Sequence, residues 1–121
     1  MNEIKENLDQ YLHSNSTYLT GREEGKDVRK RLNLDELDDS KEKEVTFFIS
    51  DKITGINISF FLGLFSKSIK KLKEKEFRKK YKFEYSDKET QDLVEEDIEY
   101  GINEALDDRT LNEILFGEEG K

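Results

Sequence analysis

Ser59 stands where the hydrophobic pattern of residues 53–72 changes from alternation to helical spacing, and this position suits it to chemistry. Serine is a preferred N-cap, in which its oxygen accepts a hydrogen bond from a backbone N–H of the first turn, worth about 1 kcal/mol. A phosphate on the same hydroxyl would lie at the positive end of the helix and would add about two negative charges beside Phe60 and Phe61. The pattern therefore predicts both a helix cap and a candidate phosphoacceptor at Ser59, and the two roles are compatible.

The other reactive residue types do not favour an enzyme. The chain has no Cys, which excludes a disulfide framework, a Cys-ligated zinc and a thiol nucleophile. Its single His, His13, has no second His with which to build a metal site. The carboxylates Glu95, Glu96, Asp97 and Glu99 alternate around a predicted helix and specify no acid–base pair. We expect a non-enzymatic protein with no metal site and no cofactor.

A strand, a turn and a helix must position Ser59. The segment Val45–Ser50 is β-branched and aromatic between charged residues, which is typical of a buried strand. A turn and a short extended piece at Ile56–Ile58 then lead into a helix predicted from Ser59 to about Lys75. This helix carries a wide apolar stripe at i, i+4, i+8 and i+11, formed by Phe61, Phe65, Ile69 and Leu72.

The segments before this unit predict two helices and a short strand. Residues 1–12 have apolar side chains at helical spacing and predict a short amphipathic helix. A short strand is predicted at Thr17–Leu19. Thr20 and Glu23 then fit a capping box, which predicts a helix that ends near Leu32. Residues 33–44 are expected to be a polar connection.

The segments after this unit predict one strand and one long helix. Residues Tyr81–Tyr85 alternate aromatic and charged side chains, as a strand with one buried face does. Ser86 and Glu89 form a second capping box before a helix whose apolar face is Val94, Ile98, Ile102 and Leu106. Residues 109–121 include a short apolar group and are expected to be a docked helix or a partner-binding segment with a frayed end. This order predicts a single small α/β domain with a partly parallel sheet.

Charge is unevenly distributed along the 121 residues, whose net charge is -8. Residues 66–82 hold nine Lys and Arg against two Glu, a net charge of +7, so the rest of the chain carries -15. The acidic remainder would repel phosphates, and nucleic-acid binding through Lys67–Lys82 is therefore not favoured. No apolar run reaches the roughly 18 residues of a membrane span, and we expect a cytoplasmic protein.

The quoted segments resemble the STAS-like family of uncharacterised function. The resemblance rests on "YLTGREEGKDVRKRL", on the strand that follows, and on "INISFFLGLFSKSIKKLKEKEFRKKYKFE" with its acidic closing helix, and it covers about residues 18–107. It implies a STAS-like α/β domain at residues 16–108. The chain would then have an N-terminal helical extension at residues 1–15 and a partly flexible C-terminal segment at residues 109–121.

More distantly, the strand–turn–Ser–helix unit resembles the STAS domain of anti-sigma factor antagonists, which present a serine at a helix start to a kinase. Their pattern is Asp-Ser-Ser-Gly-Leu-Gly, and its second Ser is phosphorylated; here Asn57, Ile58, Ser59, Phe60 and Phe61 stand at that place. Only Ser59 matches, since Asn57 replaces Asp, and Ile58 and Phe60 replace Ser and Gly.

The resemblance implies a protein partner, with an ATPase of the histidine-kinase-like fold as the candidate. The expected contact surface is formed by the segment from Asn57 to Phe61 and by Arg22. Two alternatives stay open. The chain is a small acidic inhibitor or nucleic-acid mimic if its two acidic segments, 35–44 and 92–108, share one face. It binds DNA through Lys67–Lys82 if binding depends steeply on salt. The oligomeric state is left open.

Overall fold

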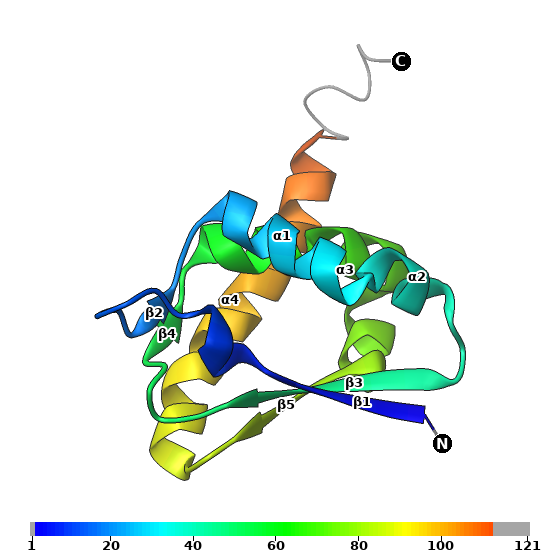
Figure 1. Cartoon of the computed structure of the whole chain (residues 1–121). Helices are drawn as coiled ribbons and strands as arrows, with labels where there is room; N and C mark the ends of the chain where they lie inside the picture. Colours follow the sequence, from blue (N-terminus) through cyan, green and yellow to red (C-terminus); the bar gives the residue numbers. More distant parts are fainter. Residues whose placement is uncertain (1, 113–121) are drawn as a thin grey trace.

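A three-stranded parallel sheet and a layer of helices form the body of the protein in a computed structural model, which describes residues 2–112 (Figure 1). The sheet order is β1–β3–β5, and a separate two-stranded parallel sheet pairs β2 with β4. In chain order the elements are β1 Asn2–Asn7, a 3₁₀ turn Leu8–Tyr11, β2 Tyr18–Leu19, α1 Arg22–Leu32, α2 Leu34–Asp39, β3 Lys43–Ile49, β4 Gly55–Ile56, α3 Ile58–Lys80, β5 Tyr81–Tyr85 and α4 Lys88–Asn112. The predicted α/β class and single small domain are confirmed.

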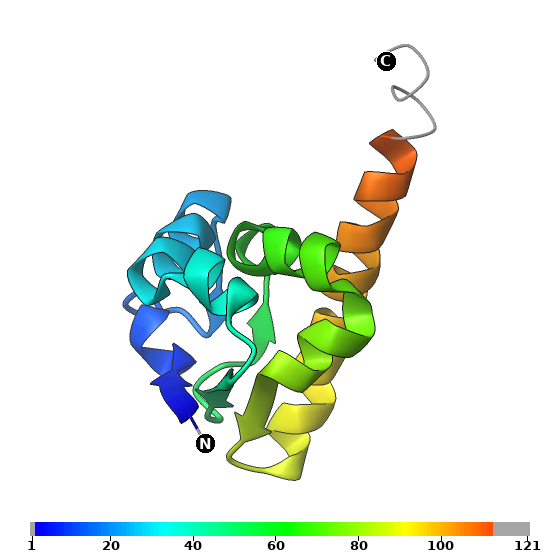
Figure 2. The ribbon, with the colours of Figure 1, turned by 90° about the vertical axis from the view of Figure 1, so that its right-hand side faces the viewer.

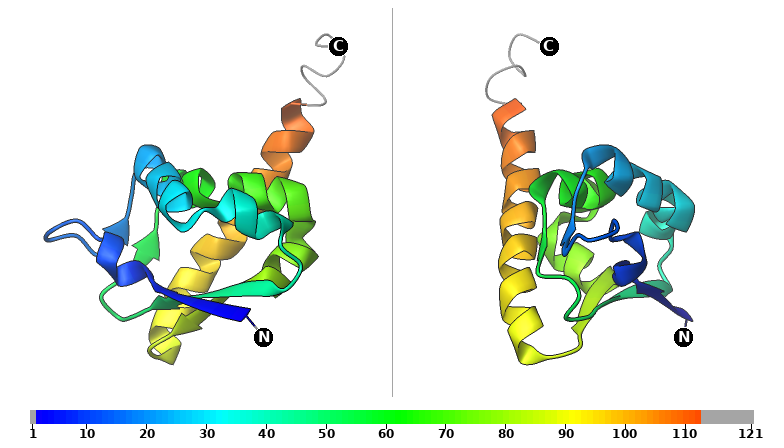
Figure 3. Two further views of the ribbon diagram at one scale, coloured as in Figure 1. Left: turned by 45° about the vertical axis from the view of Figure 1, so that its right-hand side comes forward. Right: turned by 60° about the vertical axis from the view of Figure 1, so that its left-hand side comes forward.

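The main sheet has one buried and one exposed face, as its alternating sequence predicts. Phe47 and Ile49 of β3 are buried, and the register places Phe47 beside Phe83 of β5 with ring centroids 5.8 Å apart. On the opposite face Lys82 makes an ion pair with Glu44. Helices α1, α2 and α3 lie above the sheet in Figure 1. The small β2–β4 sheet lies apart from the main sheet (Figure 3).

The helix predicted for residues 1–12 is wrong. Residues 2–7 form β1, which pairs in parallel with β3 and places Ile4 opposite Val45. The strand ends where the side-chain oxygen of Asn7 accepts a hydrogen bond from the N–H of Asp9 and begins the 3₁₀ turn. A short helix with a narrow apolar stripe is marginal alone, and the hydrogen bonds of a sheet edge outweigh its propensity. The described part of residues 1–15 thus contributes a strand to the main sheet.

Neither predicted capping box forms. Gly21 is the N-cap residue of α1, with a φ of 96°, and it makes no side-chain cap hydrogen bond. At α4 the N–H of Thr90 donates to the carboxylate of Asp87 at 2.8 Å, so Asp87 replaces Ser86 as the cap. In both cases the helix begins one residue later than the serine or threonine requires. The predicted end of α1 at Leu32 is confirmed.

Two helices differ in extent from the prediction. The connection at residues 33–44 contains α2, because Leu34 and Leu37, three residues apart, bury their side chains in the core. Helix α3 continues beyond Lys75 to Lys80 after a kink at Lys73, whose φ of 66° and ψ of 169° are not helical. The kink brings Phe77 into the core, where its ring lies 5.1 Å from that of Phe65.

The remaining elements agree with the prediction. Strands β2, β3 and β5 are found where they were expected, and β4 follows the predicted turn. The apolar face of α4 is buried as its spacing predicted, with Val94, Ile98 and Ile102 nearly inaccessible to solvent. The predicted C-terminal segment lies outside the described residues from residue 113 onward, and residues 109–112 continue α4.

Candidate functional site

Asn57, and not Ser59, caps helix α3. The side-chain oxygen of Asn57 accepts a hydrogen bond from the N–H of Ser59 at 2.8 Å, and its carbonyl accepts the N–H of Phe61 at 3.0 Å. The N–H of Asn57 in turn donates to the carbonyl of Leu19 at 2.8 Å, which ties the cap to β2. Ser59 therefore lies inside the first turn, and the predicted cap role is wrong.

The hydroxyl of Ser59 is available to a partner. The side chain is partly exposed, and across residues 2–112 no protein atom is hydrogen-bonded to its oxygen. At this position a phosphate would lie at the positive end of the α3 dipole, where anions are stabilised. The structure thus removes the cap role and keeps the geometry that a phosphoacceptor requires.

Phe60 and Phe61 are core residues. Each is 1% exposed, and the ring of Phe61 lies 5.2 Å from that of Phe65. The expectation that these two side chains contact a partner is therefore wrong, because the helical stripe turns both toward the sheet and α4. Asn57 is exposed and Ile58 is partly exposed. The outer surface at the start of α3 is therefore small and mostly polar.

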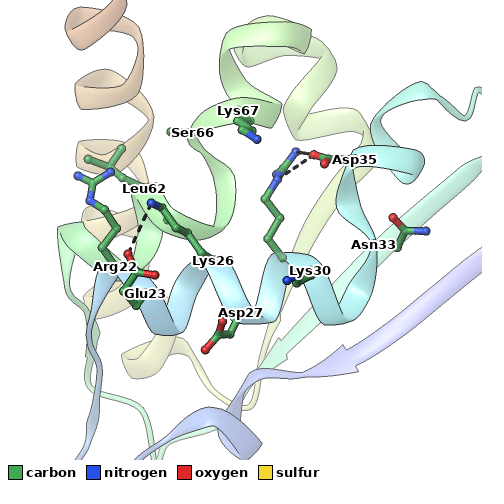
Figure 4. A pocket seen from close by; sticks show the side chains of 12 residues that line it. Arg22, Glu23, Lys26, Asp27, Lys30, Asn33, Asp35, Leu62, Ser66 and Lys67 are labelled. Atoms are coloured by element: carbon green, nitrogen blue, oxygen red, sulfur yellow. Dashed lines mark hydrogen bonds and ion pairs between the residues drawn. The ribbon is translucent and has the colours of Figure 1, made fainter.

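A groove runs between α1 and α3, with a volume of about 500 Å³ (Figure 4). It includes Arg22, the one predicted contact residue that lies outside the start of α3. Both helices and the beginning of α2 line it, through Arg22, Glu23, Lys26, Asp27, Arg29, Lys30, Asn33, Asp35, Leu62, Gly63, Ser66 and Lys67. Ser59 lies one helical turn before Gly63 and thus on the same side of α3.

Two glycines let the helices that form this groove approach each other. An added Cβ at Gly25 would lie 2.3 Å from the carbonyl oxygen of Phe60, and one at Gly63 would lie 2.3 Å from the carbonyl oxygen of Arg22. Both distances are far below a van der Waals contact. The "GREEG" and "SFFLG" segments, which carry the STAS-like resemblance, therefore supply the closest contact between α1 and α3.

The groove is richer in cations than in carboxylates. Of its charged side chains five are basic (Arg22, Lys26, Arg29, Lys30 and Lys67) and three are acidic (Glu23, Asp27 and Asp35), which gives a net charge of +2. The pKa of the Asp35 carboxyl is lowered, first by hydrogen bonds from Arg29 and then by the charges of Arg29 and of the more distant Lys67. The groove thus favours anions, although the chain as a whole is acidic.

A buried polar network lies behind the groove. The guanidinium of Arg29 donates to Asp38 at 2.9 Å, to the hydroxyl of Ser68 at 2.8 Å and to the carbonyl of Leu64 at 3.0 Å. Asp38 also accepts hydrogen bonds from Ser68 and from the hydroxyl of Tyr81. Burial, and then the hydrogen bond to Asp38, raise the pKa of Tyr81.

Sequence reasoning missed this network. Arg29 lies one turn after Gly25 on the inner side of α1, which was its only sequence signal. Among the described residues no buried side-chain polar atom lacks a hydrogen-bond partner. The network is therefore a closed structural connection between α1, α2, α3 and β5, and it leaves no buried group ready for acid–base work.

The basic run Lys67–Lys82 does not form one continuous surface. Lys71 pairs with Asp39 of α2, whereas Arg78 pairs with Glu95 of α4 and lies on the other side of α3. Lys80 donates to the backbone carbonyl of Ser40, which follows α2, and to that of Lys43, the first residue of β3. These cations are thus distributed around α3 and engaged with different neighbours, which does not support the DNA-binding alternative.

The two acidic segments are separated as well. The first covers most of α2 and continues into β3, the second lies on α4, and α3 runs between these helices (Figure 2). A nucleic-acid mimic requires its carboxylates on one face. This arrangement does not favour the acidic-inhibitor alternative.

Comparison with protein-family models, with curated proteins and with solved structures returns no match. The STAS-like assignment therefore stays a prediction. In the described part of the chain, no three His, Cys, Asp or Glu side chains gather as a metal site would require. None of the helices within residues 2–112 combines the length and apolar character of a membrane span.

Proposed function

We propose that the chain is a non-enzymatic, cytoplasmic STAS-like module that binds a partner protein and is switched by phosphorylation of Ser59. The observation that carries the proposal is the partly exposed hydroxyl of Ser59, unbonded within residues 2–112, in the first turn of α3. The partner is a histidine-kinase-like ATPase, as the resemblance implies. Its contact surface is formed by Asn57, Ile58, Ser59 and Arg22, because Phe60 and Phe61 are buried.

Phosphate at Ser59 would change the charge of this surface without disrupting the helix. The first turn of α3 carries no acidic side chain, so the new charges meet no repulsion there and are stabilised by the helix dipole. A partner surface that accepts the neutral serine would have to desolvate about two negative charges on binding the phosphorylated form. Phosphorylation is therefore expected to release that partner.

Two features support a binding role over catalysis. The polar groups behind the groove already satisfy one another, and Arg29 holds Asp35. The one histidine, His13, is exposed and lies 3.9 Å from Glu24, outside the groove. These residues provide no nucleophile with an adjacent base, which covalent catalysis requires.

The test is incubation of the purified protein with a histidine-kinase-like ATPase encoded beside it, with ATP and magnesium, followed by intact-mass measurement. We expect one phosphate on the wild type, none on Ser59→Ala, and one on the matched control Ser66→Ala. Complex formation, followed by size-exclusion chromatography, should be lost in Ser59→Asp and kept in Ser59→Ala. A phosphate that persists in Ser59→Ala, or a complex that tolerates Ser59→Asp, would refute the switch.

A further inference from the structure

The α1–α3 groove has more basic side chains than its internal ion pairs neutralise. Arg29 is 8% exposed and its donors are occupied by Asp35, Asp38, Ser68 and a carbonyl. Lys26 pairs with Glu23 at 3.6 Å, and both side chains are more than half exposed, so this pair is weak.

Three basic side chains of the groove are unpaired among the described residues. Arg22, Lys30 and Lys67 form no ion pair with any residue that the structure describes. Two of them come from α1 and one comes from α3, so they lie on both walls. Asp27 also lines the groove and forms no ion pair with any described residue, so its unpaired side chains sum to +2. A concave surface with a net charge of one sign concentrates ligands of the opposite sign.

The spacing of these cations predicts the shape of the ligand. Arg22 and Lys30 are eight residues apart on α1, which corresponds to about 12 Å along the helix. Lys67 faces them from α3, beside Ser66 (Figure 4). An isolated phosphate would reach only one end of the groove. An extended peptide rises about 3.3 Å per residue, so two acidic side chains three or four residues apart would reach both ends.

We propose that the α1–α3 groove binds an acidic peptide segment of a partner protein, with two carboxylate or phosphorylated side chains separated by three or four residues. One acidic group pairs with Arg22, and the other pairs with Lys30 and Lys67. The segment lies in the groove that α1 and α3 line, outside the close contact of the two helices at Gly63. This inference rests on the proposed function, because it gives the chemistry of the partner that the module binds.

The same geometry connects the groove to Ser59. Ser59 lies one turn before Gly63, whose neighbour across the contact is the backbone of Arg22. A negative charge at Ser59 would attract the Arg22 side chain and repel an acidic segment at that end. Ser59→Asp is therefore expected to weaken binding of the acidic segment.

The probe is a pair of synthetic ten-residue Gly/Ser peptides of identical composition, each with two phosphoserines. In one peptide three residues separate the phosphoserines, and in the other they are adjacent. Backbone amide shifts of ¹⁵N-labelled protein, recorded by NMR during titration at 50 mM salt, report both the site and the affinity. We expect shifts at α1 and at residues 62–67, and tighter binding of the spaced peptide by about threefold or more.

Matched variants separate the groove from general charge. Arg22→Gln with Lys67→Gln should weaken the spaced peptide about tenfold. The control Lys75→Gln with Lys79→Gln removes the same charge from exposed positions of α3 outside the groove and should change affinity less than twofold. Unchanged amide spectra of the free variants verify that both fold.

The inference would be overturned if the two double variants lost the same affinity for the spaced peptide, or if the two peptides bound equally well. Amide shifts confined to residues 73–82 would also overturn it. Failure of the proposed Ser59 switch can be distinguished from failure of the groove inference. Binding of the spaced peptide without phosphorylation of Ser59 by the ATPase refutes the switch and keeps the groove. Phosphorylation of Ser59 without peptide binding refutes the groove and keeps the switch.

Discussion

Replacing Gly63 with alanine should separate α1 from α3 and destabilise the protein. The new Cβ would lie 2.3 Å from the carbonyl oxygen of Arg22 and 3.2 Å from the N of Lys26. A relaxed contact needs about 1 Å more than the shorter distance, and the obstructing atoms are backbone, so no side-chain rotation relieves them. The helices themselves must therefore move.

The magnitude follows from two opposing effects. Overpacking a tight contact costs up to about 3 kcal/mol, and a clash between two backbones belongs at that upper end. Alanine gains about 1 kcal/mol over glycine in a helix interior. We therefore expect Gly63→Ala to lower the free energy of unfolding by about 2 kcal/mol, which corresponds to a fall in Tm of about 6–10 °C.

A double-mutant cycle tests the physical cause. Gly25→Ala places a Cβ 2.3 Å from the carbonyl oxygen of Phe60 and pushes the same two helices apart. Once one alanine has separated them, the second should cost less, so the double variant is expected to lose clearly less than the sum of the single losses. The control Asn103→Ala gains helix propensity at an exposed position of α4 and should be neutral or slightly stabilising.

The assay is urea unfolding followed by circular dichroism, with thermal melts as a second measurement. The explanation fails if Gly63→Ala is as stable as the wild type, because propensity would then dominate and the contact would tolerate a methyl group. Strict additivity in the double variant would also contradict it. In that case the two glycines would act at independent sites, and the groove would not depend on one shared helix contact.

Three further predictions concern buried polar groups and strain. Asp38→Ala leaves the buried Arg29 guanidinium with only the exposed carboxylate of Asp35 and removes the acceptor of the Ser68 and Tyr81 hydroxyls, so it should cost about 3 kcal/mol in urea unfolding, whereas a loss below about 1 kcal/mol would contradict the network. Lys73→Gly should stabilise by about 1 kcal/mol, because φ is 66° there, and a destabilised variant would show that this backbone is unstrained. Burial and then a carboxylate partner raise the pKa values of Tyr81 and Tyr85, so stability is full below the unfolded value near 10 and falls as pH rises above it. Tyr81→Phe should flatten that fall between pH 9 and 11, and an unchanged slope would exclude Tyr81 as its cause.

The parts of the fold that the sequence predicted are those with a strong local period. Strand β3 has a nearly continuous apolar run, β5 alternates, and the buried face of α4 repeats every three or four residues. Strand β1 gives no such signal, because its outward residues are polar and Ile4 is its main apolar side chain. Its partner β3 lies 41 residues away in sequence, from Ile4 to Val45. Only that distant pairing decides between strand and helix.

The helix caps and the groove also could not be predicted from the local sequence alone. Asn57 and Ser59 both suit an N-cap, and so do Ser86 and Asp87, so the path of the backbone makes the choice. Arg22 was named from the sequence as a residue of the partner surface. The groove was not, because it depends on the close approach of α1 and α3 at two glycines that are 38 residues apart, Gly25 and Gly63.

The position of β1 has a consequence for the newborn chain. It is synthesised before β3, the strand with which it pairs among the described residues, and at 5–20 residues per second the delay between them is about 2–8 s. During this interval an extended segment with unpaired N–H and C=O groups is open to association with other chains. Glu3, Lys5 and Glu6 give it alternating charge, which discourages such association. The same charged residues that make the sequence of β1 unlike a typical strand would thus protect the ribosome-bound chain against association with other chains until β3 has been synthesised.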